Sequence, residues 1–276
     1  MQKVENAKKT GVLSLQEHGL EDIPKQLFEL TNLSTLDLSK NKLTRLDQHQ
    51  HGLAKLANLK SLNCEFNQLQ RGTLTPVAHL AKLQTLSLGN NRLGHDVPMD
   101  KNNPSAQQPD CLPPLPASLK QVKLNTNHLT TVPPQICSPS LSKLQKLDLS
   151  FNHLASVPAA IGGLVSLVEI NLDSNLIVAL PEEIGALKKL KSLSLKNNSI
   201  SVESTNFHPT RNPQPLPAAL FTETPLTDLN LAGNKITNTA LNEFDGFEKF
   251  LERRQKVKTK GVYGGALTNL SVCGLD

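Results

Sequence analysis

The sequence is poor in aromatic residues, with no tryptophan, one tyrosine and eight phenylalanines among its 276 residues. A globular core of this size normally draws on aromatic side chains, because each of them buries a large area. A core made of Leu, Val and Ile instead favours one small unit that is used many times along the chain.

Long apolar runs and a paired cysteine pattern are also missing. No stretch of about 18 apolar residues is present, so we expect no integral membrane contact. The first residues, MQKVENAKKTG, lack the apolar segment of a secretory signal. The cysteines have no paired spacing, which fits a reducing, cytoplasmic location. We expect Cys64 in the core, Cys137 partly buried, and Cys111 and Cys273 exposed.

The excess of positive charge is concentrated in one segment. The chain has a net charge of +5, and residues 248–260 hold six basic residues against two acidic ones. The remainder is therefore close to neutral, whereas nucleic-acid-binding proteins carry a broad basic surface. We expect no nucleic acid among the partners.

A repeat with the pattern L-x-x-L-x-L-x-x-N-x-L runs through most of the chain. Its clearest copies lie in residues 144–164 and 167–187, which are 23 residues apart. It begins weakly, with His18 in the place of the asparagine. The asparagines of the eight fuller copies are Asn41, Asn67, Asn91, Asn127, Asn152, Asn175, Asn198 and Asn234. The pattern is that of the leucine-rich repeat.

This repeat predicts an α/β fold. In L-x-L the two leucines point to one side of a strand, and stacked strands bury them in one continuous column. Each buried Leu contributes roughly 1.5–3 kcal/mol. We therefore predict a right-handed solenoid, or horseshoe, of about nine repeats with a parallel β-sheet on its concave face. The asparagine amides can both donate and accept hydrogen bonds, so we assign them to backbone groups in the turns and not to a ligand.

The pattern also divides the chain into domains. Residues 1–236 form the predicted repeat domain, with insertions at about 94–111 and 201–224. The second half of most units, as in VPAAI, predicts a short helical turn that begins at Pro. Apolar residues at helical spacing predict a C-terminal helical cap at 237–260, and residues 261–276 are expected to be a disordered tail.

The repeat length and the L-P-x-x-I turn resemble those of short intracellular leucine-rich repeat proteins, which include the plant intracellular Ras-group-related and Ras-suppressor types. VENAKKTGVLSL and FDGFEKFLERRQKVKTKG resemble the ends of one narrower type within this family. That type starts with a longer Met-Gly segment suited to N-myristoylation. Here Gln2 follows Met1, so we expect no lipid anchor. The resemblance implies protein–protein interaction, with roles in signalling.

The residues between and beside the strand leucines point away from the core, so we predict that a protein partner binds this concave face. Phe66 and Phe151 lie just beyond it; we interpret them as core residues of the turns, with binding hot spots as the alternative. The candidate partner-binding residues are Asp37, Ser39, Asn63, Glu65, Ser87, Lys123, Asn125, Lys146, Asp148, Glu169, Asn171, Asp173, Ser194, Lys196, Asp228 and Asn230.

We therefore predict a monomeric, non-catalytic interaction scaffold without a cofactor. A regulatory subunit of a phosphatase or small-GTPase complex is the alternative, and an enzyme or metal-binding protein using the inserted loops is a third. Asp47, His49 and His51 could begin a metal site, but the sequence identifies no third ligand, so we predict none. No phosphate-binding glycine loop, nucleophile elbow or C-x-x-C pair is present. The PPLP at 113–116 fits a WW-type ligand, but we interpret it as the helical-side turn of its repeat.

Overall fold

The structure is a computed structural model that describes residues 2–49, 52–95, 110–202, 214–261 and 273–275. The chain forms two compact units, Met1–Leu144 and Gln145–Asp276, and each is described by itself. Much of the two predicted insertions and of the predicted tail lies outside the described residues.

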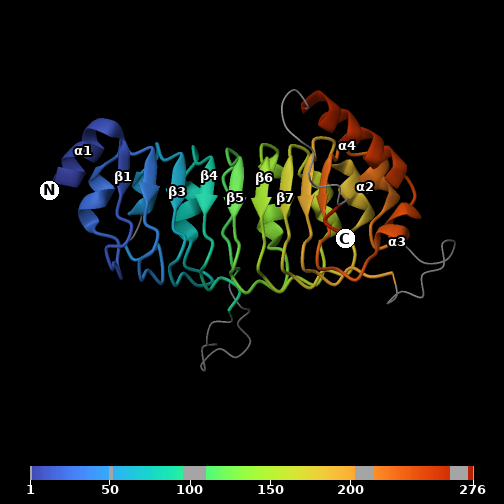
Figure 1. Ribbon diagram of the computed structural model, residues 1–276. Coiled ribbons are helices and arrows are strands. Elements are labelled where there is room, and N and C mark those ends of the chain that lie inside the picture. Colours follow the sequence, from blue (N-terminus) through green and yellow to red (C-terminus); the bar gives the residue numbers. More distant parts are fainter. Residues whose placement is uncertain (1, 50–51, 96–109, 203–213, 262–272, 276) are drawn as a thin grey trace. The chain divides into compact units, whose positions relative to one another are not determined.

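The first unit contains five short parallel strands with helices on their other side (Figure 1). Each strand pairs with the next along the chain over three residues. The strands are β1 (Val12–Ser14), β2 (Thr35–Asp37), β3 (Ser61–Asn63), β4 (Thr85–Ser87) and β5 (Gln121–Lys123). The helices are α1 (Gln2–Thr10) and the 3₁₀ helices η1 (Lys25–Glu29), η2 (Leu53–Lys55), η3 (Thr75–His79), η4 (Pro134–Cys137) and η5 (Pro139–Leu141).

The second unit repeats this arrangement with four parallel strands in chain order. Its strands are β6 (Lys146–Asp148), β7 (Glu169–Asn171), β8 (Ser192–Ser194) and β9 (Asp228–Asn230). Its helices are η6 (Ala159–Gly163), η7 (Glu182–Ala186), α2 (Ala218–Thr222), α3 (Asn238–Asn242) and α4 (Phe247–Gly261). Parallel strands, one per repeat, with short helices behind them, confirm the predicted leucine-rich repeat solenoid and its helical cap.

The core forms because the central residue of every strand is apolar. Leu36, Leu62 and Leu86 are fully buried and lie side by side in register across β2, β3 and β4. A strand of three residues can bury only one or two side chains by itself, so the stacking of repeats creates the core. Within the described residues, no helix combines the length and the apolar content that crossing a membrane requires.

The helical turns differ from the prediction by one position. Pro24, Pro133, Pro158 and Pro181 do not open the helix; they occupy the N-cap, with ψ between 129° and 152°. Extended backbone at the residue before a helix is the usual N-cap conformation. In these four turns the proline ends the incoming turn and the helix starts at the next residue. In η4 that residue is Pro134, so this helix does begin at a proline as predicted.

The asparagine column ties adjacent repeats together. Asn175 donates from Nδ2 to the carbonyls of Leu149, Leu172 and Asp173, at 3.1, 3.0 and 3.2 Å. Its Oδ1 accepts from the backbone N–H of Leu154 at 3.0 Å. One buried amide thus satisfies backbone groups in its own repeat and in the preceding one.

Both ends of the chain differ from the sequence-based expectation. The helix α1 was not predicted, because QKVENAKKT has no apolar stripe and buries only Ala7 among its described side chains. The cap consists of two helices, not one: α3 and α4 are separated by residues 243–246. Of the predicted tail, Cys273–Leu275 is ordered and packs near β9.

The cap is held to α2 by aromatic packing and by one arginine. The rings of Phe247 and Phe250 in α4 lie 5.4 and 6.2 Å from the ring of Phe221 in α2. Arg253 donates from Nη2 to the carbonyl of Phe221 at 2.6 Å and from Nε to the carbonyl of Leu226 at 3.2 Å. Part of the basic segment is therefore structural and not available to a partner.

Candidate functional site

The predicted partner-binding residues lie on the outer side of the strands, which we call the strand face of each unit. In the first unit Asp37, Asn63 and Lys123 end their strands and are half-exposed, as are Glu65 and Asn125 just beyond. The other two predicted residues do not offer a contact surface, because Ser39 is 6% and Ser87 is 7% exposed.

Polar side chains on this face bind the backbone next to them. Asp37 Oδ1 accepts from the N–H of Ser39 at 2.9 Å, and Asn63 Oδ1 accepts from the N–H of Glu65 at 3.0 Å. Lys123 Nζ lies 3.9 Å from the carboxylate of Glu65. The first unit therefore offers a polar strand face whose side chains are already positioned.

The strand face of the second unit carries more charge. Lys146 pairs with Glu169 at 2.6 Å. Asp173 Oδ1 accepts from Ser194 Oγ at 2.5 Å and from the backbone N–H of Lys196 at 2.8 Å. The predicted residues Asn171 and Asn230 each accept a backbone N–H two residues on.

Three aspartates of this face interact with neutral donors. Asp148 accepts from the N–H and the hydroxyl of Ser150, and Asp228 accepts from the hydroxyl of Ser192 at 2.8 Å. Among the described residues, no ion pair includes Asp148, Asp173 or Asp228. Asp228 is exposed and Asp148 and Asp173 are half-buried, so negative charge gathers on this face, which favours a partner with basic side chains.

Phe66 and Phe151 are not core residues, which corrects our preferred interpretation of them. Their side chains are 50% and 61% exposed. Each has a left-handed backbone, with φ of 56° and 54°, because the chain must turn sharply between the strand and the asparagine. The same turn position holds Lys40 and Ser174 in other repeats, and this polar occupancy is the sequence signal that could have shown the exposure.

Further apolar side chains are exposed in the repeat that follows the one with Phe151. Leu176 and Val178 lie in the turn after β7 and are about half-exposed. This turn is bonded to the one that holds Phe151, since the N–H of Leu176 donates to the carbonyl of Leu154 at 2.9 Å. The second unit therefore combines an apolar edge with an acidic strand face.

The candidate metal residues do not form a site. The Asp47 carboxylate accepts from Arg45 Nε at 2.6 Å, and the ring of His49 packs against Phe28 with centroids 5.6 Å apart. His51 lies outside the described residues. Over the described part of the chain, no three metal-ligating side chains come together.

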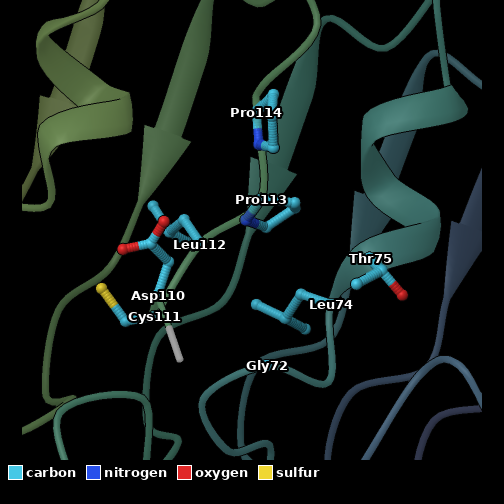
Figure 2. A pocket seen from close by; sticks show the side chains of 8 residues that line it. All are labelled: Gly72, Leu74, Thr75, Asp110, Cys111, Leu112, Pro113 and Pro114. Atoms are coloured by element: carbon cyan, nitrogen blue, oxygen red, sulfur yellow. The ribbon is translucent and has the colours of Figure 1, made fainter. Parts of the chain in front are cut away.

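A cavity of about 310 Å³ lies where the first insertion rejoins its repeat, lined by Leu74, Cys111, Leu112 and Pro113 among others (Figure 2). Cys111 is buried, which corrects the expectation that it is exposed. Burial raises the pKa of its thiol, which disfavours the nucleophilic thiolate. In the adjoining PPLP stretch Leu115 and Pro116 are buried, so the motif serves as part of the repeat.

The other cysteines are also buried and unpaired. Cys64 lies in the core and Cys137 is buried against the helical side, close to expectation. Cys273 was expected to be exposed, but it is 1% exposed at the edge of β9.

Comparison with known proteins is consistent with this geometry. A family model described as "Leucine rich repeat" matches residues 11–69 and 117–177. The LRR ectodomain of the plant membrane receptor kinase GASSHO1/SCHENGEN3 from Arabidopsis thaliana, solved in complex with CASPARIAN STRIP INTEGRITY FACTOR 2, is 29% identical with a TM-score of 0.53. That match covers 81% of this chain and 24% of the ectodomain, so the chain spans about a quarter of its length.

The Leptospira interrogans LRR protein LIC12759 is 24% identical with a TM-score of 0.49, over 88% of this chain and 74% of that one. The repeats of the sequence and the parallel strands of each unit give the chain the fold of a leucine-rich repeat solenoid.

Proposed function

We propose that the chain is a non-catalytic, monomeric interaction scaffold of the cytoplasm that binds a protein partner on its strand face. The observation that carries this proposal is Phe151. A large apolar side chain is held exposed on a left-handed backbone, where it costs stability and contributes little packing. Strain and exposure at one residue favour a role in binding.

The surroundings of Phe151 support the same function. Its N–H donates to the carbonyl of Asp173 at 2.8 Å, which brings the aromatic residue next to the acidic strand face. Asp148, three residues earlier in the same repeat, is half-buried at the end of β6. The strand face thus offers an aromatic anchor beside unneutralised carboxylates, which suits a partner surface with basic and apolar side chains.

The structural comparison adds support at the level of the fold. The receptor ectodomain that resembles this chain was solved with CASPARIAN STRIP INTEGRITY FACTOR 2 in complex. The cytoplasmic location rests on four buried, unpaired thiols. The termini further resemble those of leucine-rich repeat-containing protein fifty-seven, and the repeats resemble the Ras-suppressor and plant Ras-group-related types. A regulatory subunit of a phosphatase or small-GTPase complex is the specific form of scaffold that this resemblance favours.

A quantitative pulldown tests the proposal. The baits are the full chain, a strand-face variant (Asp148→Lys with Phe151→Asn) and a control variant (Val165→Asn with Glu182→Lys). The control removes one exposed apolar side chain and reverses one charge outside the strand face. We expect the strand-face variant to recover at least tenfold less of a stoichiometric partner, and the control to recover it in full.

Equal recovery by all three folded baits would place binding elsewhere. Asp37→Lys tests the strand face of the first unit separately, by the same comparison. A phosphatase or a small GTPase recovered in equal amount with the bait would support the regulatory-subunit form.

A further inference from the structure

The three residues Cys273–Leu275 return to the outer edge of β9 and cover it. The carbonyl of Cys273 accepts from the N–H of Leu231 at 2.7 Å, and the carbonyl of Leu275 accepts from Asn238 Nδ2 at 2.7 Å. Both side chains are buried, with Cys273 1% and Leu275 7% exposed. We call these residues the closing segment.

The closing segment takes the place that a next repeat would occupy. In the second unit the N–H of Leu172 donates to the carbonyl of Ser194, and the N–H of Leu195 donates to that of Asn230, each at 2.8 Å. These bonds join the residue after one strand to the last residue of the next strand. The bond from Leu231 to Cys273 continues the same series by one step. The closing segment therefore supplies the carbonyl that a next strand would supply, but its backbone is a turn, because Cys273 and Gly274 both have left-handed φ, of 61° and 70°.

The contacts of the closing segment show which types of residue fit against the edge of β9. Gly274 has φ of 70°, and a Cβ there would lie 2.9 Å from Asn230 Oδ1 and 3.1 Å from the Cβ of Ala232. Only glycine fits such a close approach in this backbone conformation without strain. The residue before it must be small enough to be buried as Cys273 is, and the residue after it must be apolar, as Leu275 is.

An open sheet edge is a template for pairing with another chain, and covering it is one way to block such pairing. We propose that the outer edge of β9 is a docking site for a protein segment of the type small residue–Gly–aliphatic residue that adopts the same left-handed turn, and that the closing segment is a built-in competitor for it. The bonds from Leu231 and Asn238 go to backbone carbonyls of the closing segment, which any chain can offer, so a partner segment of this type can replace it. This site shares Asn230 with the strand face, but its existence does not depend on the proposed function.

Peptide binding to an emptied edge tests this inference. The proteins are the full chain and a chain that lacks residues 262–276. The probe is a fluorescein-labelled peptide SVCGLD, the sequence of residues 271–276, in reducing buffer. The control peptide carries Gly274→Val. Because a tethered segment acts at a high local concentration, we expect the shortened chain to bind the probe at least tenfold more tightly than the full chain. The control peptide should bind at least tenfold more weakly than the probe.

Two measurements on the full-length chain keep the test decisive if the shortened chain loses its circular dichroism signal. Amide hydrogen exchange should show Leu231 protected in the unmodified chain and at least tenfold less protected in Leu275→Asp, which places a charge in a buried position. The Leu275→Asp chain should then bind the probe. An unprotected Leu231 in the unmodified chain, unchanged protection in Leu275→Asp, or a folded, emptied chain that does not bind the peptide would overturn the inference.

Discussion

At the scale of single residues, Phe66 and Phe151 show how one backbone angle decides whether an apolar side chain is core or surface. In both cases the left-handed residue three positions after the end of a strand points out of the repeat, although it is apolar. The sequence indicates an apolar residue but not its φ. The sequence also did not reveal the burial of Ser39. This small side chain is buried because the register places it beside the longer Glu65 of the next repeat.

Replacing Phe151 by asparagine should not destabilise the protein. Asparagine adopts the left-handed region more readily than phenylalanine does, and little buried surface is lost. We expect the free energy of unfolding, measured with urea, to stay unchanged or to rise by about 1 kcal/mol. A loss larger than about 1 kcal/mol would mean that the ring packs in the core after all.

Removing the Asn175 amide should be costly. Alanine at this position leaves the N–H of Leu154 and the carbonyls of Leu149 and Leu172 without the amide partner that they share. We expect a loss of about 3 kcal/mol in the free energy of unfolding. Asn242→Ala, at an exposed position of α3, serves as the control and should change it by less than about 0.5 kcal/mol. Equal effects of the two substitutions would show that the asparagine column does not hold the repeats together.

The buried thiols should make stability fall at high pH. Burial raises the pKa of the Cys64 thiol, and it raises the pKa of Cys273 to about 12 from its usual 9.0. The unfolded thiol ionises near pH 9 while the folded thiol stays protonated, so stability is complete below pH 9 and declines as pH rises toward the folded pKa. From pH 8 to pH 10, we expect the full chain to lose about 1.4 kcal/mol more than Cys64→Ala in urea unfolding. The same loss in both proteins would contradict this.

At the scale of elements, the strands were predictable and the chain ends were not. The L-x-L alternation specifies a strand in each repeat because only a period of two buries both leucines. The helix α1 lacks such a signal, since Ala7 alone anchors it among its described side chains. The break between α3 and α4 has a local cause in Gly246, which has φ of 80° and lies directly before the first residue of α4. An uninterrupted series of phenylalanines at helical spacing concealed that break.

Substituting this glycine should loosen the cap. A Cβ at Gly246 would lie 2.4 Å from Thr222 Cγ2 of α2, in addition to the strain of positive φ. We expect Gly246→Ala to reduce the free energy of unfolding by about 2 kcal/mol. Gly163→Ala is the matched control, because nothing lies within 4 Å of its added Cβ, and it should be neutral or stabilising by up to about 1 kcal/mol. Thermal melts of both variants distinguish local strain from a general effect of losing glycine.

At the scale of the whole molecule, the chain presents a repeated scaffold whose buried half is nearly uniform and whose exposed half varies. The buried positions are almost all Leu, Ile or Val, so they carry the fold and little information about a partner. The strand-face positions, together with Phe66 and Phe151, vary from repeat to repeat, so they can carry specificity for a partner. Binding through the strand face is therefore the central claim.

Hydrogen exchange of the captured complex tests that claim most directly. The account predicts that the partner slows exchange in the peptides that contain β6–β8 and the turn at Phe151. It predicts no change in the peptides that contain η6 and η7, which lie on the other side of the same repeats. Slowed exchange at η6 and η7 with unchanged exchange at β6–β8 would contradict the account and place the partner on the helical side.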